Sequence, residues 1–187
     1  ALAADTGNEV WSRDVQGGVM GSPVSYELDG EQYIAVVQGW GGESGLSFGV
    51  ITGHLNFINV SRLLVYKLGA NTALPRVEVV EQTLPMPTLE QSDAEVIAQG
   101  NYIYHNHCAG CHGGNATSAG MIPDLRYSIN IIAPAWKAIV IDGALEGNGM
   151  PNWSEYLDIE EMEKVKAYVV HEARLGFERI EKRMVKK

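Results

Sequence analysis

The segment Cys108-Ala109-Gly110-Cys111-His112 holds the residues of this sequence that are best suited to chemistry. Two cysteines separated by two residues, with a histidine directly after the second, form the attachment signature of a c-type haem. The two thiols can reach the two vinyl groups of one porphyrin, and the imidazole that follows is carried under the iron as its proximal ligand. The sequence therefore predicts one covalent haem c, anchored by Cys108 and Cys111 and ligated by His112.

Other uses of two cysteines fit this segment less well. A structural zinc site needs four ligands, and the chain has only 2 cysteines, so His105 or His107 would have to join His112 in a poor tetrahedral geometry. A thioredoxin-like redox pair needs a βαβ setting, which the flanking sequence does not supply. A disulfide within the pair would close a loop too small to add much stability. Covalent haem is the favoured interpretation.

A second axial ligand is expected from one of the 6 methionines. Met150 lies in the glycine-rich segment 146–151, far enough beyond His112 for the chain to return to the opposite face of the porphyrin. Met121 follows His112 too closely, and methionines at apolar helical positions are usually core residues. Ligation by His112 and Met150 would raise the potential and restrict the iron to transferring single electrons. The alternatives are four histidines: His54, His105, His107 and His171.

The segment 121–126 is predicted to contribute to the haem environment. The carbonyl group of Pro123 could accept a hydrogen bond from the second ring nitrogen of His112 and so set the orientation of the ring. Arg126 is a candidate partner for a haem propionate. The alternative for Arg126 is a surface position, paired with Asp124 or with water.

The composition is that of an ordinary globular protein of one domain or two small ones, with 187 residues, 45% hydrophobic and 20% charged. A net charge of −9 argues against nucleic acid as a partner. No apolar run approaches the ~20 residues of a membrane helix, so no transmembrane segment is expected. Haem c is attached outside the cytoplasmic membrane, which predicts a periplasmic location. No signal peptide is visible, so we expect Ala1 to be a cut, a processing site or a boundary.

Residues 1–74 are expected to form β structure. Strands are predicted over residues 10–15, 23–28, 32–37 and 62–68. Asp29-Gly30, between the second and third of these, is a strong hairpin signal because both central positions of such a turn need a positive φ. The glycine-rich segment 39–61 is long enough to suggest a functional loop, and its Trp40 could be a ligand platform or a core residue.

The rest of the chain is expected to be helical after a linker. Three prolines make residues 75–91 an extended, semi-rigid linker. Ser92 and Glu95 predict a capping box for a helix that ends near residue 106. Gly100 in this helix would let a second helix cross closely, with Tyr104 covering the contact. Further helices are predicted over residues 134–144 and 158–174, followed by a charged tail over 176–187.

The β region resembles part of a known enzyme family. Its first eleven residues resemble the tryptophan-docking motif of the eight-bladed propellers of pyrroloquinoline quinone (PQQ) dehydrogenases. Ala1, Thr6, Gly7 and Trp11 match this motif, whereas Ala3 stands where an aspartate is expected. Residues 21–36, followed by Gly-Trp-Gly-Gly at 39–42, are similar to the final blade of the quinohaemoprotein alcohol dehydrogenases.

The helical region resembles a class I cytochrome c. Residues 92–175 contain, in order, a helix, the two cysteines and histidine, a Pro-x-Leu segment, a helix, Gly-Met-Pro and a closing helix. Together the two resemblances imply a β segment from the end of an eight-bladed propeller, followed by an all-α class I cytochrome c domain. The implied boundaries are propeller-blade strands over 1–74, a linker over 75–91, the cytochrome c domain over 92–175 and a tail over 176–187.

These resemblances imply the haem-bearing portion of a PQQ-dependent alcohol dehydrogenase. In that family PQQ and Ca²⁺ oxidise the alcohol, and the haem passes electrons singly to an external acceptor, either a protein or a quinone. PQQ and Ca²⁺ would be bound mainly by residues outside this chain, in the remainder of the propeller, although Trp40 is placed in a possible quinone pocket. No catalytic residue is assigned to this chain. The alternative is a stand-alone cytochrome c electron-transfer subunit with a β docking segment.

Overall fold

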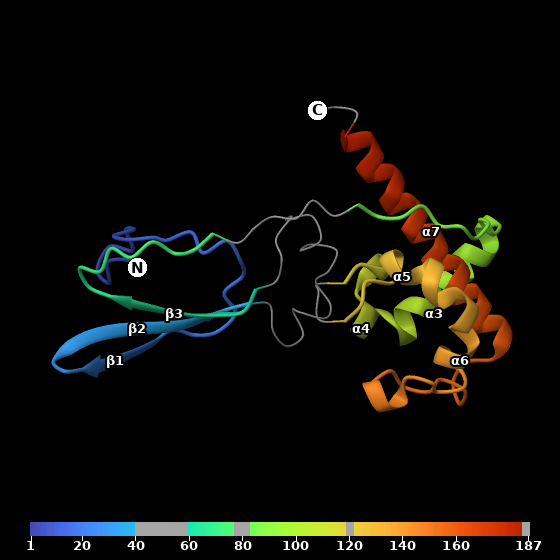
Figure 1. Cartoon of the computed structure of the whole chain (residues 1–187), viewed down its shortest axis with the longest axis horizontal. Helices are drawn as coiled ribbons and strands as arrows, with labels where there is room; N and C mark the ends of the chain where they lie inside the picture. Colours follow the sequence, from blue (N-terminus) through green and yellow to red (C-terminus); the bar gives the residue numbers. More distant parts are fainter. Residues whose placement is uncertain (40–59, 77–82, 119–121, 185–187) are drawn as a thin grey trace. The chain divides into compact units, whose positions relative to one another are not determined.

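The computed structural model describes residues 1–39, 60–76, 83–118 and 122–184, which fall into two compact units (Figure 1). The first unit contains residues 1–39 and 60–76, and the second contains the described residues from 83 onward. The first is built on a sheet and the second on helices, so the predicted order of a β segment followed by an all-α domain is confirmed. Among the described residues, no helix combines the length and the apolar character that crossing a membrane requires.

The first unit contains a three-stranded antiparallel sheet in the order β1 (Val24–Leu28), β2 (Glu31–Gln38), β3 (Arg62–Lys67). Asp29 and Gly30 join β1 to β2 with φ values of 54° and 77°, which confirms the predicted hairpin. The strand predicted over residues 10–15 is wrong. Its main chain pairs locally instead, because the backbone N–H groups of Val10 and Trp11 both donate to the carbonyl of Ala1.

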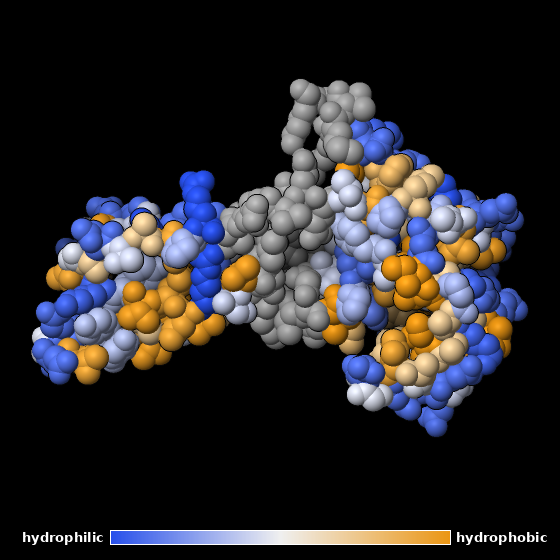
Figure 2. All heavy atoms as spheres, in the orientation of Figure 1, coloured by the Kyte–Doolittle hydropathy of each residue, from blue (hydrophilic) through white to orange (hydrophobic). Residues whose placement is uncertain are grey.

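The two faces of this sheet have different surroundings. On one face Trp11 packs edge-on against Tyr66, with ring centroids 5.0 Å apart, and Leu64 is buried. Side chains alternate between faces along a strand, and paired residues share a face. The other face therefore carries apolar side chains that are 40–68% exposed: Val24, Tyr26, Val37, Leu63 and Val65. Figure 2 shows hydrophobic side chains at the surface of this unit.

The second unit is helical. Its α-helices are α3 (Ala94–His107), α4 (Ala109–His112), α5 (Leu125–Ile132), α6 (Trp136–Val140) and α7 (Ile159–Met184). Three short 3₁₀ turns lie between them: η1 (Gly114–Ala116), η2 (Ala133–Ala135) and η3 (Glu146–Asn148). The predicted capping box of α3 is wrong, because Asp93 occupies the N-cap position and makes no side-chain capping bond. The Glu95 carboxylate instead accepts a hydrogen bond from Gln99 one turn later.

Gly100 allows α3 and α7 to cross closely, as predicted. A Cβ atom at residue 100 would overlap the carbonyl oxygen of Lys164 and lie 3.1 Å from the Cβ atom of Tyr168. Tyr104, one turn after Gly100, packs on Tyr168 with ring centroids 5.1 Å apart. The crossing therefore depends on the absence of a side chain at residue 100.

We expect Gly100→Ala to lower the free energy of unfolding of the haem-loaded chain by about 1–3 kcal/mol, the usual cost of overpacking a close contact. The added methyl group meets helix backbone, which cannot move aside as a flexible side chain can. Urea unfolding followed by far-UV circular dichroism measures the change. Gly147→Ala is the matched control, because nothing lies within 4 Å of a Cβ atom at residue 147. Equal stabilities for the two variants would show that the helices can separate at this point.

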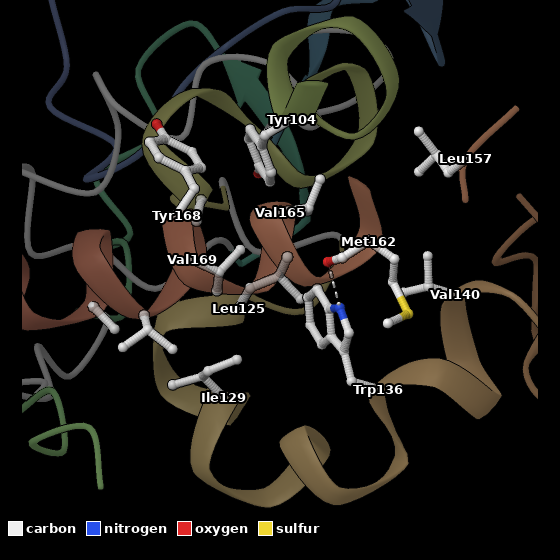
Figure 3. Packing of buried hydrophobic residues seen from close by; sticks show 13 residues of the cluster. Tyr104, Leu125, Ile129, Trp136, Val140, Leu157, Met162, Val165, Tyr168 and Val169 are labelled. Atoms are coloured by element: carbon white, nitrogen blue, oxygen red, sulfur yellow. Dashed lines mark hydrogen bonds between the residues drawn. The ribbon is translucent and has the colours of Figure 1, made fainter. Parts of the chain in front are cut away.

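The core of the second unit lies between α3, α5, α6 and α7 (Figure 3). Trp136, which is 4% exposed, points from α6 toward α7 and donates its indole N–H to the carbonyl oxygen of Met162 at 3.2 Å. Four apolar residues of α7 are fully buried in this core, with exposed fractions of 0–2%: Met162, Val165, Tyr168 and Val169. The helix predicted over 134–144 is shorter, because it is helical only over 136–140 after the 3₁₀ turn at 133–135.

Two helical segments depart from expectation. Helix α5 was not predicted; it begins after Asp124, whose side chain accepts a hydrogen bond from the backbone N–H of Arg126. Its buried residues are Leu125 and Ile129. Helix α7 continues to Met184 through most of the predicted tail, and around Arg174 and Gly176 it has a further surface to pack against.

That surface is the segment 83–91, which was predicted to be part of a linker. It is extended, as expected, but it is attached to the helical unit. Leu84 packs so closely on α7 that a Cβ atom added at Gly176 would lie 2.6 Å from its side chain. Arg174 donates to the carbonyl oxygen of Leu89 at 2.9 Å. The side chain of Asn130 on α5 accepts from the backbone N–H of Thr88 and donates to the carbonyl oxygen of residue 86.

Candidate haem-attachment site

The two thiols and the imidazole lie on one short helical turn directly after α3. The backbone N–H of Cys108 donates to Tyr104 at 2.8 Å, and the backbone N–H of His112 donates to Cys108 at 2.9 Å, which closes helix α4. Cys108 is partly buried, Cys111 is exposed, and no disulfide joins them. Burial, followed by the neighbouring Cys111, raises the pKa of Cys108 to about 12, so its thiol is neutral.

Burial and one backbone contact set the orientation of the His112 side chain. It is 9% exposed, and burial lowers its pKa, which favours the neutral imidazole. Its Nδ1 atom lies 3.3 Å from the carbonyl oxygen of Pro123. A carbonyl can only accept, so Nδ1 carries the proton and Nε2 keeps its lone pair for a metal. This is the contact that the sequence analysis expected of Pro123.

Met150 lies beside the same hydrophobic core as the attachment turn. It is partly buried and packs against the core cluster, as do Cys108 and Ala109. Gly149, with φ of 90°, ends the turn η3, and the backbone N–H of Met150 donates to Leu145 at 3.2 Å. Two thiols and a neutral imidazole on one turn, with a thioether beside the core that Cys108 also contacts, match the donor set of a c-type haem. The ligand role of Met150 stays a prediction.

The other methionines and histidines that were considered as iron ligands have surroundings different from those of Met150, as far as the structure describes them. Met162 is a core residue, 1% exposed, whereas Met20 and Met86 are 53% and 43% exposed. Each of three histidines has a near neighbour: the Asn101 carbonyl for His105, the Trp153 ring for His107 and the Gln91 amide for His171. Met121, His54 and Trp40 lie outside the described residues. Among those described, no three side chains of the types His, Cys, Asp and Glu form a metal-ion cluster.

Two tyrosines hold the chain directly after His112, a feature that the sequence did not reveal. Tyr104 on α3 is fully buried and donates its hydroxyl to the carbonyl oxygen of Gly113 at 2.8 Å. Tyr168 on α7 donates to the side-chain oxygen of Asn115 at 3.3 Å. Burial is the main cause that raises the pKa of both tyrosines, so both hydroxyls stay protonated. The sequence offered one local signal, at Asn115, because asparagine tolerates the left-handed conformation that this residue adopts, with φ of 55°.

Arg126 forms a forked ion pair with Asp124. Its Nε atom lies 3.0 Å from one carboxylate oxygen, and a terminal nitrogen lies 2.7 Å from the other. The partner is the Asp124 of the alternative expected from the sequence, but the two side chains are only 16% and 15% exposed, so the pair is not at the surface. A propionate contact of Arg126 stays a prediction.

Comparison with known proteins was made on both sequence and structure. A family model described as cytochrome C oxidase, cbb3-type, subunit III matches residues 95–169. The chain is 35% identical over 173 residues to quinohemoprotein alcohol dehydrogenase ADH IIB of Pseudomonas putida, covering 91% of this chain and 25% of that protein. It is 34% identical over 177 residues to lupanine 17-hydroxylase [cytochrome c] of a Pseudomonas species, covering 92% and 25%.

Solved structures share the fold of this chain. The quinohemoprotein alcohol dehydrogenase ADHIIG of Pseudomonas putida HK5 matches with a TM-score of 0.75 and 31% identity, over 92% of this chain and 25% of that chain. The enzyme from Comamonas testosteroni shares the fold, with a TM-score of 0.59 and 23% identity. This chain spans about a quarter of the length of the relatives that it matches. It is homologous to the C-terminal part of the quinohaemoprotein alcohol dehydrogenases, and residues 95–169 are its cytochrome c domain.

Proposed function

We propose that this chain is the haem c electron-transfer portion of a PQQ-dependent alcohol dehydrogenase. It accepts electrons from the reduced quinone and passes them one at a time to an external acceptor, either a protein or a quinone. The observation that carries the proposal is the pairing of His112 Nδ1 with the Pro123 carbonyl, which leaves Nε2 for iron on the same turn as two thiols. Homology to quinohaemoprotein alcohol dehydrogenases supports the wider reaction.

The chain's own residues bind, orient and shield the cofactor. When bound, haem c supplies an iron centre that carries one electron at a time. Cys108 and Cys111 would hold the porphyrin through thioethers, and His112 would bind the iron through Nε2 while Pro123 holds its ring. The thioether of Met150 would be the other iron ligand and would keep water and dioxygen from binding there. Tyr104 keeps the attachment turn in place by holding Gly113.

The exposed apolar face of the sheet supports a second part of the proposal. Side chains such as Leu63 and Val24, which are 68% and 61% exposed, need a partner surface that the described residues of this unit do not provide. We infer that protein outside this sequence covers the face, as the remainder of a propeller would. PQQ and Ca²⁺ would then be bound mainly by those outside residues, with Trp40 near the quinone. A periplasmic location follows from the site of haem c attachment.

The reaction is tested on the complete polypeptide that contains this sequence. We expect the purified complete protein to carry PQQ and its haem to become reduced when a primary alcohol is added without oxygen, as followed by absorbance. Residues 1–187 alone, loaded with haem, should stay oxidised under the same conditions. A complete protein that holds haem but no quinone would overturn the dehydrogenase assignment and favour the stand-alone cytochrome subunit.

Limited proteolysis of residues 1–187 provides a further test. We expect cleavage within residues 1–82 to be fast and cleavage within 92–175 to be slow, because an uncovered sheet opens readily while the helical core is buried. Mass spectrometry of timed samples identifies the cuts. A β unit that resists proteolysis in a monomeric chain would favour a self-sufficient docking segment.

A further inference from the structure

Asp124 is a carboxylate surrounded by N–H donors and directly follows the residue that contacts His112. One oxygen accepts from the backbone N–H and the Nε atom of Arg126, both at 3.0 Å. The other accepts from a terminal nitrogen of Arg126 at 2.7 Å and from the backbone N–H of Ser118 at 3.2 Å. These four N–H donors are the surroundings expected of an ionised carboxylate. Asp124 therefore places a negative charge in a site that is only 15% exposed.

This charge lies close to the imidazole. The carbonyl of Pro123, one residue before Asp124, is 3.3 Å from His112 Nδ1. Charges in such a partly buried site interact more strongly than they do in water and are screened less by salt. The charge of Asp124 would therefore act on an iron ion bound by His112.

Arg126 supplies the opposite charge at the same place. Its guanidinium is 16% exposed and is held by the fork to Asp124. One of its terminal nitrogens lies 3.4 Å from the position that a Cβ atom would have at Gly176 on α7. The pair thus combines an anion bound into the loop beside His112 with a cation on the side that faces α7.

We propose that the Asp124–Arg126 pair sets the reduction potential of the haem iron. Asp124 favours the oxidised iron, because adding an electron beside a fixed negative charge is unfavourable, and Arg126 limits this effect. The inference rests on the proposed function, since it requires a haem ligated by His112. Both residues act through their charges, and neither needs to touch the porphyrin.

The test is a redox titration of the haem-loaded chain with mediator dyes, followed by absorbance. Asp124→Asn should raise the potential, and Arg126→Leu should lower it. A purely structural role predicts a different pattern, because breaking the fork from either side would loosen the Pro123 loop in the same way. Shifts in the same direction for both variants, or no shift in either, would overturn the proposal.

A second ion pair in the same unit provides matched controls. Lys137 and Asp142 form a pair whose side chains are 54% and 51% exposed. Asp142→Asn and Lys137→Leu remove the same charges from the surface, and we expect much smaller shifts that disappear at about 1 M salt. The shifts at Asp124 and Arg126 should persist at that salt. Equal shifts at the two pairs would mean that net charge alone acts, and the proposal would be wrong.

Two further measurements distinguish a failure of this inference from loss of the haem in a variant and from a failure of the proposed function. Asp124→Ser removes the charge but keeps a good N-cap for α5, so it replaces Asp124→Asn if that variant loses haem; its potential should also rise. Covalent attachment and the low-spin spectrum of the unmodified chain are checked first. Absence of covalent haem would refute the proposed function itself, whereas unchanged potentials in a chain with covalent haem would refute only this inference.

Discussion

The double variant Cys108→Ala, Cys111→Ala is expected to contain no covalently bound haem and to lose the cooperative unfolding of its helical unit. Without the thiols neither thioether can form, and the apolar side chains beside the attachment turn are left without the porphyrin. Each 100 Å² of apolar surface that the ring removes from water contributes about 2.5 kcal/mol. A porphyrin covers several such areas, which is comparable with the roughly 5–15 kcal/mol of net stability of a whole domain.

Haem staining of a denaturing gel and extraction with acidic acetone measure the attachment, and urea unfolding measures the stability. The single variants Cys108→Ala and Cys111→Ala are the controls, since each keeps one thiol and should retain part of the haem. The sheet-based unit contains neither cysteine and should be unaffected. If acidic acetone extracts the haem from the unmodified chain, the linkage is not covalent and the assignment of the motif is wrong.

The variant Met150→Ala should have the second largest effect, on the iron itself. Loss of the thioether opens the sixth position, so the reduced protein should bind carbon monoxide and the low-spin spectrum should disappear. The reduction potential should fall by roughly 0.1 V or more, a fraction of the ≈ 0.8 V range over which axial ligands set haem potentials. The thioether favours Fe(II), which explains the direction of the shift.

Met162→Leu is the matched control for this prediction. Met162 is also a methionine of the helical unit, but it is 1% exposed and packs in the core. Its replacement by leucine conserves volume and should cost less than about 1.5 kcal/mol, with the haem spectrum unchanged. An unchanged spectrum in Met150→Ala would exclude Met150 as the ligand and would direct attention to the histidines.

The sequence alone determined the features that depend on covalent spacing or on neighbouring residues. The spacing of Cys108, Cys111 and His112 places three reactive groups on one turn whatever the rest of the chain does. Asp29-Gly30 predicted its hairpin because positive φ angles are a local preference. Gly100 indicated a close helix crossing because only a residue without a side chain permits one.

Only the tertiary structure decided which distant groups meet. Ser92 and Glu95 have the spacing of a capping box, yet helix α3 begins after Asp93, because local preferences of this kind differ by little in energy. Residues 10–15 were predicted to form a strand, but the main chain of Val10 and Trp11 pairs with Ala1.

The surroundings of the attachment site were also decided by long-range packing. Arg126 was expected either at the haem or at the surface, and it lies in a mostly buried fork with Asp124. The segment 83–91 packs against helix α7 at Arg174 and Gly176, and Tyr168 on that helix reaches Asn115, which is 53 residues away in sequence. Such contacts join segments that are distant in sequence, and they form because burying both surfaces together stabilises the fold more than any local preference does.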